Sequence, residues 1–331
     1  MSTEGGTRAI IAAMLANAGI AIAKFIAFLI TGASSLLAES VHSLADTANQ
    51  ALLLLGGKRA KRQATAEHPF GYGRERYIYA FIVSIVLFSL GGLFALYEGY
   101  HKIEQVLEGE SELVSPLVAI VVLVVAIGLE TFSLRTAIKE SNHVRGSQSW
   151  VQFIRHSRAP ELPVVLLEDI GAEIGLFLAL AGVGLSTITG NGIYDGIATM
   201  GIGLLLVIIA VILAIETKSL LLGESATDSD VAKIREAITS HDVEGIIHMR
   251  TLHLGPEELL VAAKVAVAAE VTAADIAAGI DATEKRIREA VPIARVIYLE
   301  PDLRRSAGSV TEAAGGAPEP AGADTQTNTE A

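Results

Sequence analysis

The sequence predicts a multi-pass α-helical membrane protein with six transmembrane helices, followed by a small α+β domain. The chain of 331 residues is 51% hydrophobic, yet its formal net charge is −12. Such a composition requires apolar and charged residues to lie in different regions. Long apolar runs dominate residues 8–217, whereas the sequence from Gly223 onward is polar, Ala-rich and acidic. We therefore divide the chain into a membrane domain (1–222), a cytosolic domain (223–303) and a tail (304–331).

Six segments are long enough to cross the hydrocarbon core of a bilayer, which takes about 20 helical residues. They are residues 8–30, 36–57, 77–100, 113–134, 163–187 and 193–216. The second and fifth segments carry several ionisable residues. Such residues are tolerated within a membrane when they face the interior of a helix bundle, so we keep both segments as spans.

The loops between these segments alternate in charge. The loop after the second segment contains six Lys and Arg residues and the loop after the fourth contains five, whereas the loops at the other end contain only Lys102. Cytosolic loops of membrane proteins are enriched in Lys and Arg. Both termini are therefore expected in the cytosol, and the membrane is expected to be the plasma (inner) membrane.

The region after Gly223 predicts a ferredoxin-like, open-faced sandwich with the order helix, strand, strand, helix, strand. The expected elements are a helix over 229–240 with Ser229 as N-cap, strands over 245–255 and 258–268, a helix from Thr272 to Val291, and a strand over 294–301. The turn Gly255-Pro256 separates the first two strands, and Thr272 caps the second helix. The tail is rich in Ala, Gly, Pro, Thr and Glu, which is typical of disorder.

The second segment carries an unusual group of ionisable residues. His42 and Asp46 are four residues apart and share one helical face, with Glu39 one turn further along. An ionisable group at the bilayer centre costs roughly 2.5–3.5 kcal/mol and needs a compensating partner. A divalent cation is one such partner. The alternative is that His42 and Asp46 pair with each other or with a basic residue such as Lys24.

A second acidic cluster lies in the fifth segment. Asp169 and Glu173 share a face, while Glu168 points about 100° away from Asp169. The second and fifth segments run in opposite directions, so Asp46 and Glu173 are expected at similar depth. Because the chain has no Cys, a metal must be bound by His, Asp or Glu. We predict a tetrahedral site of His42, Asp46, Asp169 and Glu173, which suits Zn²⁺ but also Mn²⁺, Fe²⁺ or Co²⁺.

Several runs resemble the cation diffusion facilitator family, in its zinc transporter nine-like branch. They are ESVHSLADTANQ, HPFGYGRERY, LPVVLLEDIGAEIG and STITGNGIYDGIATMGIG. The resemblance implies a proton-coupled metal antiporter that forms a homodimer, with ligands on helices two and five and a metallochaperone-like cytosolic domain. His42 and Asp46 match the helix-two pair. In helix five the position four residues before Asp169 is Val165, which cannot bind metal, so the pair is Asp169 with Glu173, or Glu168 substitutes.

The predicted function is efflux of divalent metal cations, most of all zinc, in exchange for protons. Metal and protons compete for the same His and carboxylate groups, and the sequence lacks the G-x-x-x-x-G-K-[ST] run of an ATP-binding loop. The alternative is a membrane-tethered metal sensor or regulator without transport; a channel also remains open. An enzyme is not expected, because an H-E-x-x-H signature is missing.

The expected partners follow from this function. They are the metal ion, protons, membrane lipid and a second copy of the chain, and we expect neither nucleic acid nor a resident cofactor. Two further acidic side chains have expected roles. Asp195, at the start of the last membrane segment, is expected to cap a helix and not to bind an ion, and Glu130 is expected to pair with Arg135.

Overall fold

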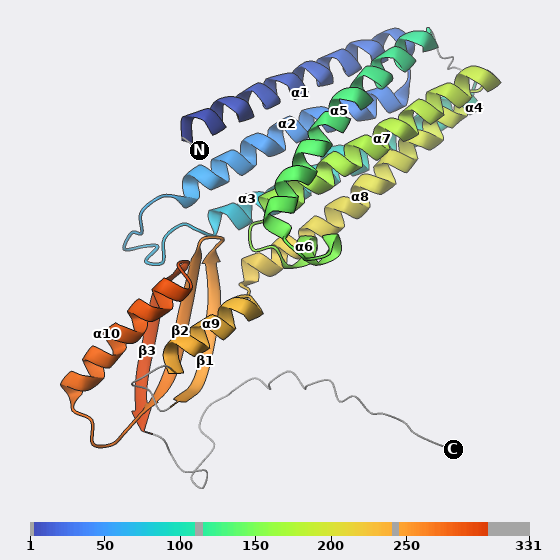
Figure 1. Cartoon of the computed structure of the whole chain (residues 1–331). Helices are drawn as coiled ribbons and strands as arrows, with labels where there is room; N and C mark the ends of the chain where they lie inside the picture. Colours follow the sequence, from blue (N-terminus) through green and yellow to red (C-terminus); the bar gives the residue numbers. More distant parts are fainter. Residues whose placement is uncertain (1–2, 110–114, 240–244, 304–331) are drawn as a thin grey trace, which may run out of the picture.

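The computed structural model describes residues 3–109, 115–239 and 245–303. Within this part of the chain, six long helices form an elongated bundle, with the C-terminal domain at one end (Figure 1). They are α1 (Thr3–Thr31), α2 (Ser34–Ala60), a continuous helix of α3 (Glu75–Val86), η1 (Leu87–Leu93) and α4 (Phe94–Leu107), then α5 (Pro116–Arg145), α7 (Glu161–Thr189) and α8 (Ile193–Leu222). Each contains one of the six predicted segments, except that the segment 113–134 begins before α5: Ser115 precedes the helix, and residues 113 and 114 lie outside the described residues.

Three of these helices are both long and apolar enough to cross a membrane, in the part of the chain that the structure describes. They are Glu75–Leu107, Pro116–Arg145 and Ile193–Leu222, and Asn17–Thr31 is a shorter apolar stretch of α1. Large hydrophobic side chains such as Phe132 and Ile188 lie exposed on the outside of the bundle. Exposed apolar side chains on long apolar helices are what lipid contact requires, so the bundle is a helical membrane domain.

Glycines let α4 and α8 pack closely. A Cβ atom placed on Gly99 would lie 2.8 Å from the Gly196 carbonyl oxygen, and one placed on Gly203 would lie 2.9 Å from the Gly92 carbonyl oxygen. Without side chains at these positions the two backbones can approach each other, which is a common basis of helix association in lipid. This contact holds the π-helical segment η1 beside α8.

Asp195, in the first turn of α8, caps the neighbouring helix α2. Its carboxylate accepts hydrogen bonds from the Ser34 backbone N–H at 2.6 Å and from the Ser34 hydroxyl at 3.0 Å, and it also accepts from the Ser35 hydroxyl. These donors belong to the start of α2, whose first-turn N–H groups have no partner within the helix. The predicted capping role is therefore confirmed, and the capped helix is α2: Asp195 ties α8 to the start of α2.

The C-terminal domain has the predicted order of elements. They are α9 (Asp228–Thr239), β1 (Gly245–Gly255), β2 (Glu258–Val267), α10 (Ala273–Ala290) and β3 (Ala294–Leu303). The sheet order is β1-β2-β3, with β1 antiparallel and β3 parallel to β2. Alternate residues of β2 are buried and pack with Ile234 of α9 and Ile287 of α10. Figure 1 shows both helices on one face of the sheet.

Of the two N-cap residues predicted for this domain, one is confirmed and the other is wrong. Thr272 accepts a hydrogen bond from the Asp275 backbone N–H, as predicted. For α9 the cap is Thr227 and not Ser229, because the Thr227 hydroxyl accepts from the Asp230 backbone N–H at 3.2 Å and the helix begins one residue earlier. The predicted disorder of residues 304–331 concerns positions outside the described residues.

The β1–β2 turn touches the membrane domain. A Cβ atom on Gly255 would lie 2.8 Å from the Gly73 Cα atom, so the turn sits against the loop that precedes α3. Next to this contact, Arg76 pairs with Glu161 at the start of α7 and reaches Glu257 in the turn, with Nη1–Oε1 at 3.6 Å. The C-terminal domain is thus joined to the same end of the bundle at which α2 finishes and α7 begins.

Candidate functional site

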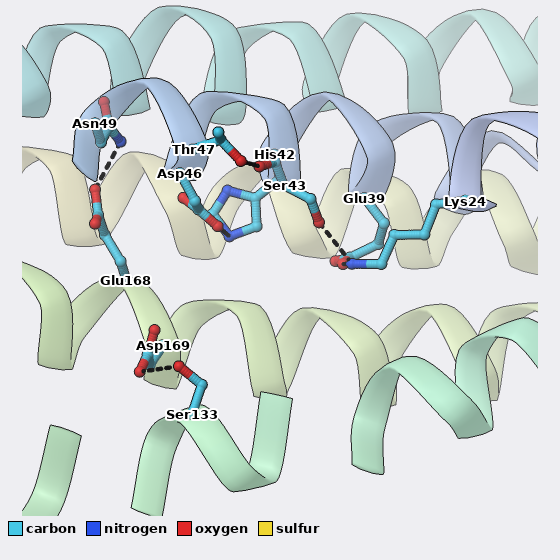
Figure 2. A network of polar contacts seen from close by, with 10 residues as sticks. All are labelled: Lys24, Glu39, His42, Ser43, Asp46, Thr47, Asn49, Ser133, Glu168 and Asp169. Carbon is cyan, nitrogen blue, oxygen red and sulfur yellow. Dashed lines mark hydrogen bonds and ion pairs between the residues drawn. The ribbon is translucent and has the colours of Figure 1, made fainter. Parts of the chain in front are cut away.

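One face of α2 carries four polar side chains inside the bundle. Glu39, His42, Asp46 and Asn49 are spaced by three or four residues, so they lie one above the other along the helix. All four are buried. Figure 2 shows that His42 and Asp46 project into the space between α2 and α7. The sequence-predicted face of α2 is therefore the face that points to the bundle interior.

Glu39 is neutralised by a buried lysine. Lys24 of α1 lies 3.0 Å from a Glu39 carboxylate oxygen and donates a second hydrogen bond of 2.8 Å to the Ser43 hydroxyl. Both charged side chains are fully buried, and breaking a buried pair by removing one partner is strongly destabilising. The sequence left Lys24 as a possible partner of the His42–Asp46 pair, but its ion pair in the structure is with Glu39.

Among the described residues, His42 and Asp46 form no hydrogen bond or ion pair through their side chains other than the contact with each other. Their closest approach, between Nε2 and Oδ2, is 3.5 Å, which is too long for a good hydrogen bond. Both ring nitrogens of His42 and the Oδ1 atom of Asp46 are buried and have no hydrogen-bond partner in the described part of the chain. Buried polar atoms in native proteins nearly always have one. This pair therefore offers an imidazole and a carboxylate that a cation could bind.

The acidic side chains of α7 point in two directions. Glu168 faces α2, where its carboxylate accepts a hydrogen bond of 2.7 Å from the Asn49 side chain. Asp169 and Glu173 face α5: Asp169 accepts from the Ser133 hydroxyl at 3.1 Å, and Glu173 accepts from the Thr131 hydroxyl at 2.8 Å. Figure 2 shows Glu168 next to Asn49 and Asp169 next to Ser133. The two neighbours therefore meet different helices, and the prediction that they lie on different faces of α7 is confirmed.

The four predicted ligands are brought into one region but not into coordination contact. Three carboxylates lie within electrostatic range of Asp46: Glu168, Glu130 and Asp169. Among the described residues, no group of three or more His, Asp or Glu side chains is close enough to hold a metal ion. Glu173 is half-buried and is held by Thr131 on α5. The four-residue site stays a prediction.

Glu130 of α5 does not have its predicted partner. Its carboxylate is buried, at 7% exposure, and interacts electrostatically with Lys24 and Glu173. Arg135 lies five residues further along α5 and is exposed, so the predicted Glu130–Arg135 pair is wrong. Positions five residues apart lie on different sides of a helix. Glu130 therefore faces the bundle interior, whereas Arg135 faces outward.

A cavity leads to this region from the end of the bundle where the C-terminal domain lies. Its volume is about 840 Å³, and it lies between α2, α5 and α7. Asp169 and Ser133 line it, together with Gln50, Lys58, Lys61, Arg76, Glu140, Glu161 and Glu257 among others. On α2 the lining runs to the end of the helix, and on α7 it runs from the first residue to Asp169. Asp169 is therefore reached from this end of the bundle.

Some residues of this region were not foreseen from the sequence. Asn49 lies three residues after Asp46 on the same face, so the helical period that selected His42 and Asp46 also indicated it. Gly175 of α7 was also missed: a Cβ atom there would come within 2.5 Å of a Glu39 carboxylate oxygen. No local pattern indicates Gly175, since its neighbour comes from another helix.

A bundle of long apolar helices that encloses His, Asp and Glu side chains is the architecture of a membrane transport protein with an internal ion site. The sequence comparison agrees: the family described as cation efflux transmembrane domain matches residues 10–222. The chain belongs to the cation efflux, or cation diffusion facilitator, family.

Named relatives come from animals, plants and bacteria. The chain is 34% identical over 251 residues to the proton-coupled zinc antiporter SLC30A9, mitochondrial, of Xenopus laevis, which covers 75% of this chain and 44% of the relative. It is 28% identical to metal tolerance protein C4 of Arabidopsis thaliana, over 77% of this chain and 56% of the relative. It is 25% identical to magnetosome protein MamB of Magnetospira sp. (strain QH-2), over 74% of this chain and 78% of the relative. The chain therefore spans less than half the length of the animal antiporter.

Proposed function

We propose that this protein exports divalent metal ions, zinc first, across a membrane in exchange for protons. The proposal is supported by the family and by the printed names of the relatives, which include a proton-coupled zinc antiporter and a metal tolerance protein. The observation that carries it is the cavity of about 840 Å³ that reaches Asp169, which lies within electrostatic range of Asp46. Both ring nitrogens of His42 and the Oδ1 atom of Asp46 have no hydrogen-bond partner among the described residues.

The transported ion binds His42, Asp46 and Asp169 in this proposal, with Glu173 as the fourth ligand predicted from the sequence. Glu168 is the competing candidate, because Asn49 holds it against α2 one turn from Asp46. A divalent ion would supply the charge that this cluster of carboxylates lacks in the membrane interior. Ligands must lose protons to bind metal, so proton binding from the opposite side can release the ion.

We further propose that all six long helices span the membrane, with both termini in the cytosol and the protein in the plasma membrane. The support is the charge of the loops: Lys58, Lys61 and Arg76 lie at the end of the bundle that carries the C-terminal domain, and such residues are enriched on the cytosolic side. The cavity then opens toward the cytosol, as loading of an exporter requires. The α-β-β-α-β order supports a ferredoxin-like, metallochaperone-like assignment for the C-terminal domain.

The functional unit in this proposal is a homodimer. In the described part of the C-terminal domain, helices cover only one face of the sheet (Figure 1), and Tyr298 is exposed on β3. A small domain with an open sheet gains apolar burial by pairing with a second copy. Light scattering on the detergent-solubilised protein should give the mass of two chains. A monomer that still transports would contradict this part of the proposal.

Zinc uptake into sealed proteoliposomes tests the function. With an outward-directed proton gradient, we expect zinc to accumulate above its external concentration, and a protonophore should abolish the accumulation. A gradient-independent flux that stops at equal concentrations would indicate a channel instead. Absence of any flux from a dimer that binds zinc would favour a membrane-tethered sensor.

A further inference from the structure

The short helix α6 (Trp150–His156) is fixed to the outside of the bundle at its C-terminal-domain end (Figure 1). Ser149 and Gln152 form a capping box at its start. Phe153 is buried and packs with Ala137 of α5 and Leu166 of α7. The capping box and this apolar contact hold α6 in a defined orientation, so its outward-facing side chains form a defined surface.

The level of α6 along the bundle is set by its neighbours. Arg155 reaches Glu216 of α8, with Nε–Oε1 at 3.7 Å, and Phe153 packs beside Leu134 of α5. Charged residues begin at this level on both helices. On α5 they follow Phe132, which is 76% exposed, and on α8 they follow the exposed Ile215. If the long helices span the membrane as proposed above, α6 lies at the boundary between hydrocarbon and water.

The outward side of α6 and of the adjoining end of α5 combines apolar and basic side chains. Val144, Trp150 and Val151 are exposed large hydrophobic residues. The Arg145 guanidinium lies 4.4 Å from the centre of the Trp150 ring. The exposed basic residues on these segments are Lys139, His143, Arg155, His156 and Lys218. The acidic residues are Glu140, Glu216 and Glu224, and Glu224 is paired with Arg158. The surface therefore has an excess of positive charge around an apolar centre.

We propose that α6 and the adjoining end of α5 form an interfacial anchor that binds the anionic phospholipids of the membrane leaflet. Trp150 lies at the level of the lipid headgroups, where the amphipathic indole ring is favoured. Val144 and Val151 contact the upper acyl chains, and Arg145 and Arg155 bind lipid phosphates. Basic side chains next to an apolar face are the usual requirement for binding an anionic membrane surface.

The chain contains a single Trp, so its tryptophan fluorescence, excited selectively over the tyrosines, reports on α6 alone. The full-length protein is reconstituted in vesicles of phosphatidylcholine, with or without added phosphatidylglycerol, and Trp150 is quenched in turn by brominated lipids and by aqueous iodide on both sides of the membrane. We expect stronger quenching by lipids brominated near the headgroup than by lipids brominated near the chain end. Phosphatidylglycerol should shift the emission to shorter wavelength and reduce iodide quenching.

Two matched variants separate the charge effect from a general one. Arg145→Gln combined with Arg155→Gln should abolish the response to phosphatidylglycerol. Lys285→Gln combined with Arg288→Gln removes the same charge from α10 of the C-terminal domain and should leave the response unchanged. A variant that has lost its fold is recognised by its circular dichroism, and Arg145→Lys with Arg155→Lys then serves as the charge-preserving substitute.

Two results would overturn the anchor. Strong iodide quenching in both vesicle types without quenching by brominated lipids would place Trp150 in water. Protection from both quenchers would place it in a protein–protein contact. Neither result depends on zinc flux. Failure of the anchor proposal can therefore be distinguished from failure of the proposed transport function.

Discussion

Asn49 of α2 donates a hydrogen bond of 2.7 Å to Glu168 of α7, and both side chains are buried. This bond fixes the rotation of α7 against α2. With Glu168 turned to α2, Asp169 and Glu173 are turned to α5, where the Ser133 and Thr131 hydroxyls hold them. A neutral amide therefore lies between the two acidic helices, one turn from Asp46.

Asp46→Asn should abolish metal transport and leave a folded dimer. Asn nearly keeps the shape of the side chain but lacks the charge that offsets the desolvation of a divalent ion. We expect zinc uptake into proteoliposomes to fall below about a tenth of the parental rate. Even the loss of a residue that only hydrogen-bonds to a metal ligand lowers metal affinity or activity roughly 10- to 100-fold.

Glu108→Gln is the control for this substitution. Glu108 is exposed just beyond α4, so its loss changes the net charge equally but should not alter uptake. Zinc uptake by Asp46→Asn at the parental rate would show that Asp46 is not a ligand.

His42→Asp should keep a cation site but change its preference. A carboxylate replaces the imidazole, and harder ions such as Mn²⁺ favour oxygen ligands over nitrogen. The ratio of manganese to zinc uptake, measured with both ions present, should rise. An unchanged ratio at an unchanged total rate would indicate that His42 does not contact the ion.

The three acidic residues of α7 can be ranked by single substitutions. Asp169→Asn should reduce zinc uptake most, because Asp169 lines the cavity and lies within electrostatic range of Asp46. Glu168→Gln and Glu173→Gln then decide the fourth ligand: the helical face predicted from the sequence favours Glu173, whereas the contact with Asn49 favours Glu168.

Zinc affinity distinguishes these two outcomes more directly than the transport rate does. Isothermal titration on each variant should show weaker zinc binding for the true fourth ligand and parental binding for the other. If Asp169→Asn bound zinc with the parental affinity, Asp169 would not be a zinc ligand, and the assignment of α7 to the site would be wrong.

His253 should make the C-terminal domain less stable in mild acid. It is 1% exposed, and burial lowers its pKa, with a further decrease from Arg158 and opposing effects from the Gly255 carbonyl and Asp230. Below about pH 6.5 the unfolded chain then binds more protons than the folded one. The contribution of neutral His253 to the free energy of unfolding is therefore complete above that pH and is lost as the pH falls. Amide hydrogen exchange of β1, corrected for intrinsic rates, should show less protection at about pH 5.5 than at about pH 7.5.

His253→Gln should remove most of this pH dependence. His248→Gln is the matched control, because His248 lies on the same strand but is exposed, and it should keep the parental dependence. Equal pH dependence in both variants would assign the effect to another group.

The sequence alone determined the elements and the inward face of α2. Apolar run length predicts helices because it matches the bilayer thickness, and each predicted segment lies in a long helix of the structure. The period of the strands and turns gave the order of the C-terminal elements. The helical period placed His42 and Asp46 on one face, and that face is buried. These properties depend on neighbours a few residues away, which a single sequence contains.

Only the tertiary structure decided which partner each polar residue meets. Asp195 caps α2 and not its own helix, Lys24 pairs with Glu39, and Glu168 turns to Asn49. A period of 3.6 residues fixes the angle between two side chains on one helix, but not the rotation of that helix against its neighbours. That rotation is set by contacts between residues far apart in the chain, such as the hydrogen bond across 119 positions that joins α2 to α7.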